Sequence, residues 1–147
     1  MPDPVCSLIA FCDLVVTEQN TGKNTLVGTF HSLAWPQFPF TIPRFFVHVA
    51  ISNLVLTGKP ISIAINVKQP QTGAVVGSFG MPVNIPIPPD PPKEPIVVNF
   101  NIPFTNVVFP SPGDYAIEIL FDGEHVGERI LAIRQRPLNP PINPQNI

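Results

Sequence analysis

The sequence predicts an all-β protein, an antiparallel immunoglobulin-like β-sandwich of about eight strands. No window keeps apolar residues at the three-four spacing of a helix for three turns without meeting a proline or a β-branched run. Segments in which residues alternate between two faces recur instead, and turn signals separate them. With 147 residues the chain has the size of one domain and can bury a core without disulfides or metals.

Eight segments carry the strand pattern. They are CSLIAFCDLVV (6–16), NTLVGTFHSLAW (24–35), RFFVHVAISN (44–53), ISIAINVKQ (61–69), AVVGSFG (74–80), PIVVNFNIPF (95–104), GDYAIEILF (113–121) and HVGERILAIRQ (125–135). A turn at NTGKN separates the first two, and PQTG joins the fourth and fifth as a hairpin. Three prolines bracket QFPFTI (37–42), which marks it as a crossing segment rather than a central strand.

The last hairpin has the best-defined pattern. Its first strand turns four alternate side chains inward, which are Tyr115, Ile117, Ile119 and Phe121. The DG pair at 122–123 accepts positive φ and suits a tight turn. Simple pairing would carry Glu128 inward, so we expect a bulge at Gly127 that turns Glu128 outward and brings Leu131 and Ile133 into the core.

The prolines are most concentrated in IPIPPDPPKEPIVV (85–98). Strand patterns on both sides predict a stiff loop crossing between the two sheets of one domain, residues 1–135. Pro88, Pro91 and Lys93 also have the P-x-x-P-x-K spacing of a docking peptide. The tail at residues 136–147 contains further prolines, and it is predicted to be an extended arm.

Composition excludes several classes of partner. The chain is 44% hydrophobic but only 12% charged, and its net charge of -2 argues against nucleic-acid binding. No apolar stretch is long enough for a membrane-spanning helix, and the N-terminus lacks the basic region of a signal peptide. Cys6 and Cys12 are too far apart on one strand to bridge each other. Reduced thiols and no signal predict a cytoplasmic protein.

No catalytic or metal-binding motif stands out. The cysteines and the three histidines match no zinc spacing, so we expect no metal and no cofactor. His48 alternates with Phe46 and Ala50, which indicates a packed or hydrogen-bonded histidine of a sheet. Neither cysteine has a neighbouring base. We therefore expect a protein that is not an enzyme.

Two stretches resemble a known family. LIAFCDLVVTEQNTGKNTLVGTF (8–30) and PGDYAIEILFDGEHVGERILAI (112–133) resemble an uncharacterised family of small bacterial proteins, known as a domain of unknown function. The resemblance covers the first third and the last quarter of the chain and leaves out the proline-rich middle. It implies a single-domain β-sandwich without assigned catalytic residues.

An interaction or assembly module is the first functional hypothesis. The first strand is apolar on both sides, and we expect Ile9, Phe11 and Val15 on the outer side. Either a loop of the chain covers them or a second copy or another protein does, and the hypothesis takes the second case. The tail supplies a second candidate contact, at Pro140, Pro141 and Ile142. The alternative hypothesis is a small-ligand or glycan-binding module that uses loops near Trp35 and His125.

Overall fold

Strands are the regular structure of this chain. The structure is a computed structural model that describes residues 3–69, 71–85, 87–90 and 93–137. These ranges contain no helix, and hence none that could cross a membrane. The strands are β1 (Val5–Thr17), β2 (Asn24–Phe30), β3 (Ser32–Trp35), β4 (Phe40–Leu54), β5 (Ile61–Lys68), β6 (Val75–Val83), β7 (Ile96–Phe109), β8 (Gly113–Phe121) and β9 (Glu124–Gln135). The all-β prediction is confirmed.

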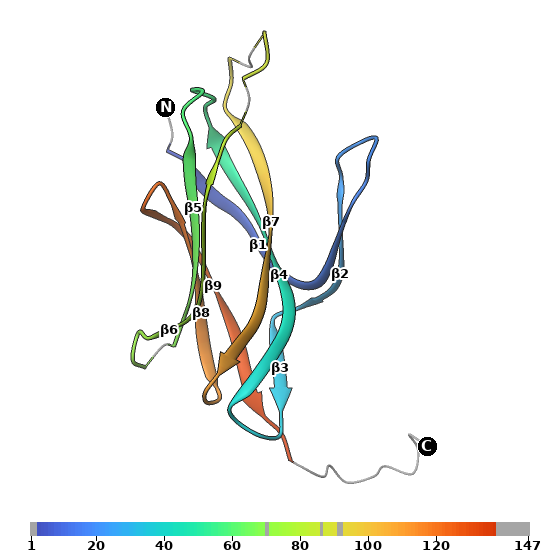
Figure 1. Cartoon of the computed structure of the whole chain (residues 1–147), viewed down its shortest axis with the longest axis vertical. Helices are drawn as coiled ribbons and strands as arrows, with labels where there is room; N and C mark the ends of the chain where they lie inside the picture. The colour runs from blue at the N-terminus through green and yellow to red at the C-terminus, as the bar shows by residue number, and fades with distance from the viewer. Residues whose placement is uncertain (1–2, 70, 86, 91–92, 138–147) are drawn as a thin grey trace.

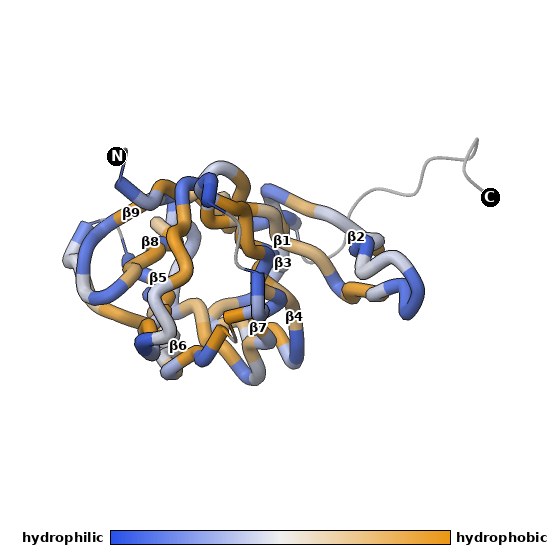
Figure 2. Tube along the Cα trace, turned by 90° about the horizontal axis from the view of Figure 1, so that it is seen from above, coloured by the Kyte–Doolittle hydropathy of each residue, from blue (hydrophilic) through white to orange (hydrophobic). Residues whose placement is uncertain are grey.

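Two sheets share the nine strands. A four-stranded sheet has the order β2-β1-β4-β7, and a five-stranded sheet has the order β3-β9-β8-β5-β6. Seen from above, β9, β8, β5 and β6 curve around one side of the interior, and β7, β4 and β1 lie around the other side (Figure 2). The β1–β2 hairpin stands out to the side of the four-stranded sheet (Figure 1). The hairpin thus extends farther from the two packed sheets than the other strands do.

One hydrophobic core lies between the sheets. Alternate residues of β4, β5 and β8 point into it, as expected of strands with one inward face. The fully buried members on these strands are Phe45, Val47, Val49, Ile51, Ile63, Ile65, Val67, Tyr115, Ile117 and Ile119. Burying one side chain of this size contributes about 1.5–3 kcal/mol. This core is therefore the main source of stability.

The last hairpin agrees with its sequence pattern. Ile119 lies opposite Gly127 and Leu120 lies opposite His125, which leaves one extra residue on β9 and makes a bulge beside Gly127. Beyond the bulge Leu131 and Ile133 are fully buried, while Glu128 is exposed. The predicted bulge is confirmed, and so is the predicted orientation of Glu128 outward and of Leu131 and Ile133 inward.

The segment NTLVGTFHSLAW forms two strands rather than one. β2 pairs antiparallel with β1, whereas β3 pairs parallel with β9, with Ser32 opposite Ala132. The change of sheet occurs at His31, whose carbonyl accepts a hydrogen bond from Ala132 N–H at 3.1 Å. The described part of the chain therefore has nine strands and is not purely antiparallel. Residue alternation continues through such a change of sheet, so the sequence pattern does not reveal it.

The prediction for QFPFTI is wrong over its last three residues. β4 begins at Phe40, and Phe40, Thr41 and Ile42 pair with β7. Pro43 is tolerated inside this strand because β1 pairs with β4 only from Phe46 to Ser52. At Pro43 the strand has a neighbour on one side, and its missing N–H removes no bond of a central ladder.

The proline-rich segment joins β6 of one sheet to β7 of the other, as predicted. Asp90, Lys93 and Glu94 are exposed in this connection. Pro91, the middle residue of the docking pattern, lies outside the described residues. The segment therefore connects two layers that share one core.

Candidate interaction surface

The two residues predicted to form a ligand surface lie far apart. Trp35 is opposite Gln135 near the end of β9, whereas His125 is near the start of β9. Positions 125 and 135 on this strand are separated by about 33 Å, at about 3.3 Å per residue. The structure therefore does not bring Trp35 and His125 into one site.

Trp35 is held by its own chain. It is 44% exposed, and Phe40 stacks on the indole with ring centroids 4.9 Å apart. The guanidinium carbon of Arg136 lies 5.6 Å from the centre of the Trp35 ring. An aromatic platform for a sugar needs a free ring face. These two contacts leave less of the indole available than the sequence suggests.

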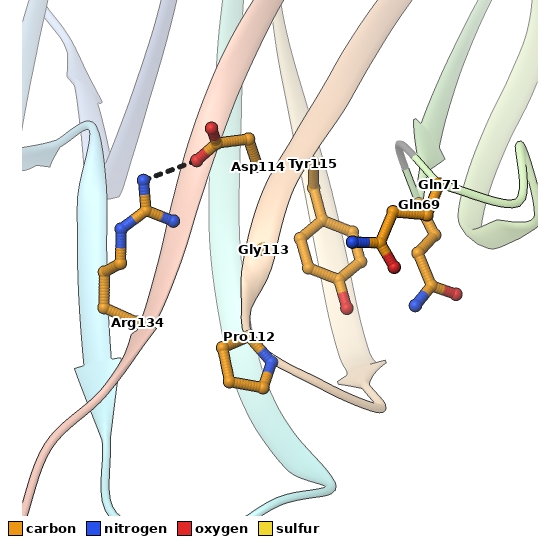
Figure 3. A pocket seen from close by; sticks show the side chains of 7 residues that line it. All are labelled: Gln69, Gln71, Pro112, Gly113, Asp114, Tyr115 and Arg134. Atoms are coloured by element: carbon orange, nitrogen blue, oxygen red, sulfur yellow. Dashed lines mark hydrogen bonds and ion pairs between the residues drawn. The ribbon is translucent and has the colours of Figure 1, made fainter.

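A cavity of about 320 Å³ opens near the same end of the molecule (Figure 3). Its lining consists of Gln69, Gln71, Pro112, Gly113, Asp114, Tyr115 and Arg134. Arg134 and Asp114 form an ion pair at 2.6 Å, so their charges compensate each other. Gln69 Nε2 donates to Ser111 Oγ at 3.1 Å, and Tyr115 Oη donates to the Ser111 carbonyl at 2.7 Å. Most of the polar groups here are already bonded within the chain.

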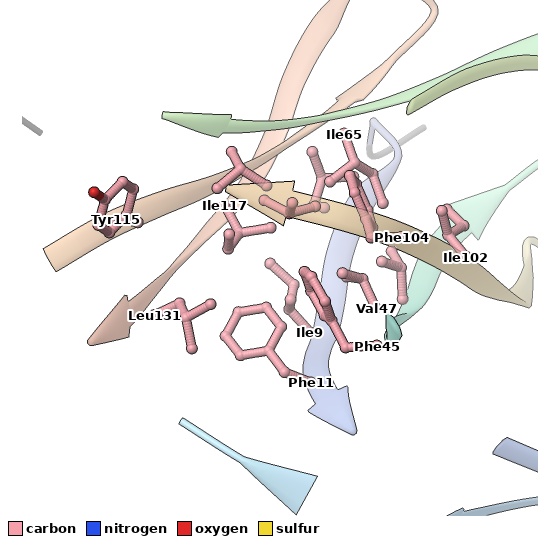
Figure 4. Packing of buried hydrophobic residues seen from close by; sticks show 14 of the residues in the cluster. Ile9, Phe11, Phe45, Val47, Ile65, Ile102, Phe104, Tyr115, Ile117 and Leu131 are labelled. Carbon is pink, nitrogen blue, oxygen red and sulfur yellow. The ribbon is translucent and has the colours of Figure 1, made fainter. Parts of the chain in front are cut away.

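The prediction for the first strand is wrong about which face is buried. The face of β1 that was expected to lie outside points into the core. Ile9 and Phe11 are 9% and 1% exposed and point into the cluster that contains Phe45 (Figure 4). Val15 is half-buried, and Leu8 on the opposite face is 46% exposed. Ile9 and Phe11 are therefore not available to a partner. The strand is apolar on both faces, so its alternation does not say which face turns inward.

The other predicted interface residues, Pro140, Pro141 and Ile142, lie outside the described residues. The surface that the structure does describe is the part of the β1–β2 hairpin beyond Asp13.

The β1–β2 ladder is interrupted at Asp13 and Gly28, which lie between the pairs Cys12–Thr29 and Leu14–Val27. Gly28 has φ of 67°, in the left-handed region that favours glycine. A side chain at position 28 would also collide with the carboxylate of Asp13. Glycine therefore satisfies both the backbone conformation and the close approach. The hairpin leaves the line of the four-stranded sheet (Figure 1).

A series of hydrogen bonds ties the bent hairpin to β7. Thr17 Oγ1 donates to Asn24 Oδ1 at 2.9 Å, and Asn101 Nδ2 donates to the same oxygen at 3.1 Å. In a flat sheet β2 and β7 would be about 14 Å apart, at about 4.8 Å per strand. A direct bond between them requires the hairpin to fold over the sheet.

His48 completes this series. It is 5% exposed, and its Nδ1 lies 2.5 Å from Asn101 Oδ1. Since an amide oxygen only accepts, this contact assigns the proton to Nδ1 of His48. The predicted packed or hydrogen-bonded histidine is confirmed. We call Thr17, Asn24, His48 and Asn101 the hairpin latch.

The hairpin presents an apolar face to solvent. Leu14, Val16 and Val27 are 47%, 49% and 45% exposed, and Leu14 lies directly opposite Val27. Val15 and Leu26, on the other side of the same strands, are half-buried. We call Leu14, Val16 and Val27 the hairpin face. The two-sided apolar run was the signal for this surface, but its exposed side could be found only from the structure.

Nucleophilic chemistry has little support among the described side chains. Cys6 and Cys12 are both free, and burial raises the pKa of each thiol. Both stay protonated near neutral pH, and a protonated thiol is a poor nucleophile. Among the described residues no cluster of three or more histidine, cysteine or acidic side chains could hold a metal ion.

Glu118 should make the stability depend on pH. Burial alone would raise the pKa of Glu118, but hydrogen bonds from Lys68 and Asn66 and the nearby positive charge outweigh it and lower the pKa. The resulting stabilisation is present above the unfolded-state pKa of about 4.3 and is lost as the pH falls through the folded-state pKa. We expect Glu118→Gln to reduce the free energy of unfolding at neutral pH, and the difference from wild type to shrink below about pH 4.

Urea unfolding between neutral and acidic pH measures this effect. Lys68→Met is the matched variant, because Lys68 Nζ lies 3.1 Å from Glu118 Oε1. Its free energy of unfolding should also be lower than that of the wild type at neutral pH, and this difference should shrink in the same way at acidic pH. A difference between Glu118→Gln and wild type that stays constant down to acidic pH would contradict the prediction.

Comparison with known proteins places the chain in a family. Residues 7–134 match the model of a protein family described as a family of unknown function. The match includes the proline-rich middle, which the resemblance had left out, and all four residues of the hairpin latch. A comparison with curated proteins gives no match. The geometry is therefore the basis for inferring the function.

Proposed function

The chain belongs to the DUF6941 family of unknown function, and from its geometry we propose that it is a non-enzymatic protein-protein interaction or assembly module. The observation that carries the proposal is the hairpin face, in which Leu14, Val16 and Val27 are each close to half exposed. Covering three half-exposed side chains of this kind contributes roughly 2–4 kcal/mol. Large apolar side chains that gather on an exposed element are typical of contact sites.

The hairpin latch supports the same proposal. The bond between Asn24 and Asn101 fixes the hairpin against the four-stranded sheet before any partner arrives. A surface that is already ordered loses less conformational entropy on binding. The latch therefore favours docking through the hairpin face.

The proposal also covers the partner of the protein and the compartment in which it works. Its partner is protein, either a second copy or a larger assembly, and the tail at residues 136–147 is the proposed second contact. Two free cysteines suit a reducing compartment, so we place the module in the cytoplasm.

We also propose that the fold is immunoglobulin-like. The neighbours β1-β4-β7 and β9-β8-β5-β6 correspond to strands A-B-E and G-F-C-C′ of such domains. The hydrogen bond from Tyr115 Oη to the Ser111 carbonyl, at the entry to β8, has the form of a tyrosine corner. Both features support the assignment.

Ligand binding is the second candidate function. Its support is the cavity beside Gln69, Asp114 and Arg134. A glycan array is the direct measurement, and the absence of any hit with the wild-type protein would end this candidate.

Affinity capture tests the interaction proposal. The immobilised chain is incubated with native lysate of its source, and bound proteins are quantified by mass spectrometry. We expect proteins that bind the wild type to be lost with Leu14→Ser/Val16→Ser. The matched control is Val75→Ser/Val97→Ser, which changes valines that are 51% and 59% exposed on other strands and should leave capture unchanged. If Leu14→Ser/Val16→Ser retains every captured protein, the hairpin face is not the contact.

A further inference from the structure

We infer that β2 pairs edge to edge with β2 of a second copy of this chain. The pairing would join two four-stranded sheets into one continuous sheet across a two-fold axis. This inference rests on the proposed function, because it names the partner of the same hairpin.

β2 is the open edge of the described fold. The strands at the ends of the two sheets are β2, β7, β3 and β6. β6 and β7 shield each other, since a Cβ built on Gly77 would lie 3.3 Å from the Val107 side chain and the Phe79 and Phe104 rings are 6.4 Å apart. β3 has four residues, while β2 has seven and packs beside β1 on one side. Figure 2 shows the hairpin projecting from the other strands.

The hairpin register shows which backbone groups are free. Glu18 N–H donates to the Lys23 carbonyl at 2.8 Å, which closes the hairpin with a hydrogen-bonded pair. Hydrogen-bonded and non-hydrogen-bonded pairs alternate from there along an antiparallel ladder. By this alternation Asn24, Leu26 and Phe30 of β2 direct N–H and C=O away from β1, while Gly28, with φ of 67°, interrupts the regular ladder. A row of free backbone groups is a template for another strand.

The sequence of β2 lacks the devices that usually protect an edge. NTLVGTF contains no charged residue and no proline. A second copy laid antiparallel therefore brings no like charges opposite each other, and its free backbone groups match by symmetry.

Full overlap of the two strands sets the register. With the axis at Val27, residues 24–30 of the two copies overlap over their full length and Val27 faces its own copy. Thr25 then lies opposite Thr29, a cross-strand combination that favours hydrogen bonding between hydroxyls. The hairpin faces of the two copies become one apolar strip along the joined sheet.

Disulfide trapping tests the register. Val27 and its copy would form a non-hydrogen-bonded pair with Cα atoms about 4.5 Å apart, within the range of a disulfide. Thr25→Cys is the matched control, because Thr25 and its copy would be about 13 Å apart along the strands. In a glutathione buffer we expect Val27→Cys to form a disulfide-linked dimer on non-reducing denaturing gels. Thr25→Cys and the wild type should form no covalent dimer and should run as single chains on the same gels. No Val27→Cys dimer, or equal trapping of Thr25→Cys, overturns the inference.

Sedimentation equilibrium supplies a second measurement without new cysteines. Leu26→Pro removes an outward N–H and leaves the hydrogen bonds between β1 and β2 intact, so we expect self-association about tenfold weaker than in the wild type. Val75→Ser/Val97→Ser, which changes exposed valines on other strands, should associate like the wild type. A strictly monomeric wild type would overturn the inference.

The two proposals fail separately. If Val27→Cys is not trapped but Leu14→Ser/Val16→Ser loses a captured protein, the hairpin face binds something other than a second copy. If Leu14→Ser/Val16→Ser retains every captured protein, the hairpin face is not the contact for those proteins, and trapping of Val27→Cys then tests the pairing of two copies by itself.

Discussion

Phe11→Ala should lower the free energy of unfolding by about 3–5 kcal/mol, the range for removing a phenyl ring from a packed core. Phe11 is 1% exposed, its ring lies 6.2 Å from that of Phe30, and the Arg129 guanidinium carbon is 5.6 Å from its ring centre. Alanine would leave a cavity that neither sheet can close without moving its backbone. Urea unfolding followed by circular dichroism measures the loss.

Leu14→Ala is the control for Phe11→Ala. Leu14 lies on the same strand but is 47% exposed, so we expect its truncation to cost less than about 1 kcal/mol. The sequence pattern predicts the opposite order, with Phe11 on the outer side. Equal costs for the two substitutions, or a larger cost for Leu14→Ala, would mean that β1 turns its other face inward.

β1 shows why part of this fold was beyond sequence reasoning. Strict alternation identifies the inward face only when one face is polar, and residues 8–16 are apolar on both sides except at Asp13. A register shift between Cys6 and Leu8 adds a second source of ambiguity. The inward choice depends on contacts with β4 and β9, which are distant in sequence.

The β8–β9 hairpin shows the opposite case. Its turn residues have positive φ, 49° at Asp122 and 82° at Gly123, and the polar position Glu128 reveals the bulge. The information is local, so the pattern predicts it correctly.

The hairpin latch lies between these two cases. A histidine within an apolar strand indicates a buried hydrogen bond, and His48 has one. Its acceptor is 53 residues away, and the next bond, from Asn101 to Asn24, spans 77 residues. Asn24 and Asn101 carry no sequence signal for this contact, because asparagine at a strand end or beside a turn is common. Asn24 and Asn101 come together only because the β1–β2 hairpin folds over the four-stranded sheet.

Asn101→Leu should release the hairpin and destabilise the core beneath it. The substitution removes the bonds to Asn24 and His48, and it leaves His48 Nδ1 without its acceptor at a position that is 5% exposed. An unsatisfied buried donor costs about 1–3 kcal/mol, which we expect as the loss in free energy of unfolding. Amide hydrogen exchange of residues 15–26 should become about five- to tenfold faster than in the wild type. Asn99→Leu, an exposed asparagine two residues along β7, should change neither quantity.

The double variant His48→Leu/Asn101→Leu separates stability from latching. Replacing both partners by apolar groups leaves no unsatisfied donor, so most of the global stability should return. Asn24 still lacks its partner on β7, so exchange of residues 15–26 should stay fast. Slow exchange in this stable double variant would show that packing alone holds the hairpin. If exchange stays fast and capture through the hairpin face weakens with it, the latch contributes to binding by ordering that face in advance, because a mobile hairpin must lose more conformational entropy when it docks.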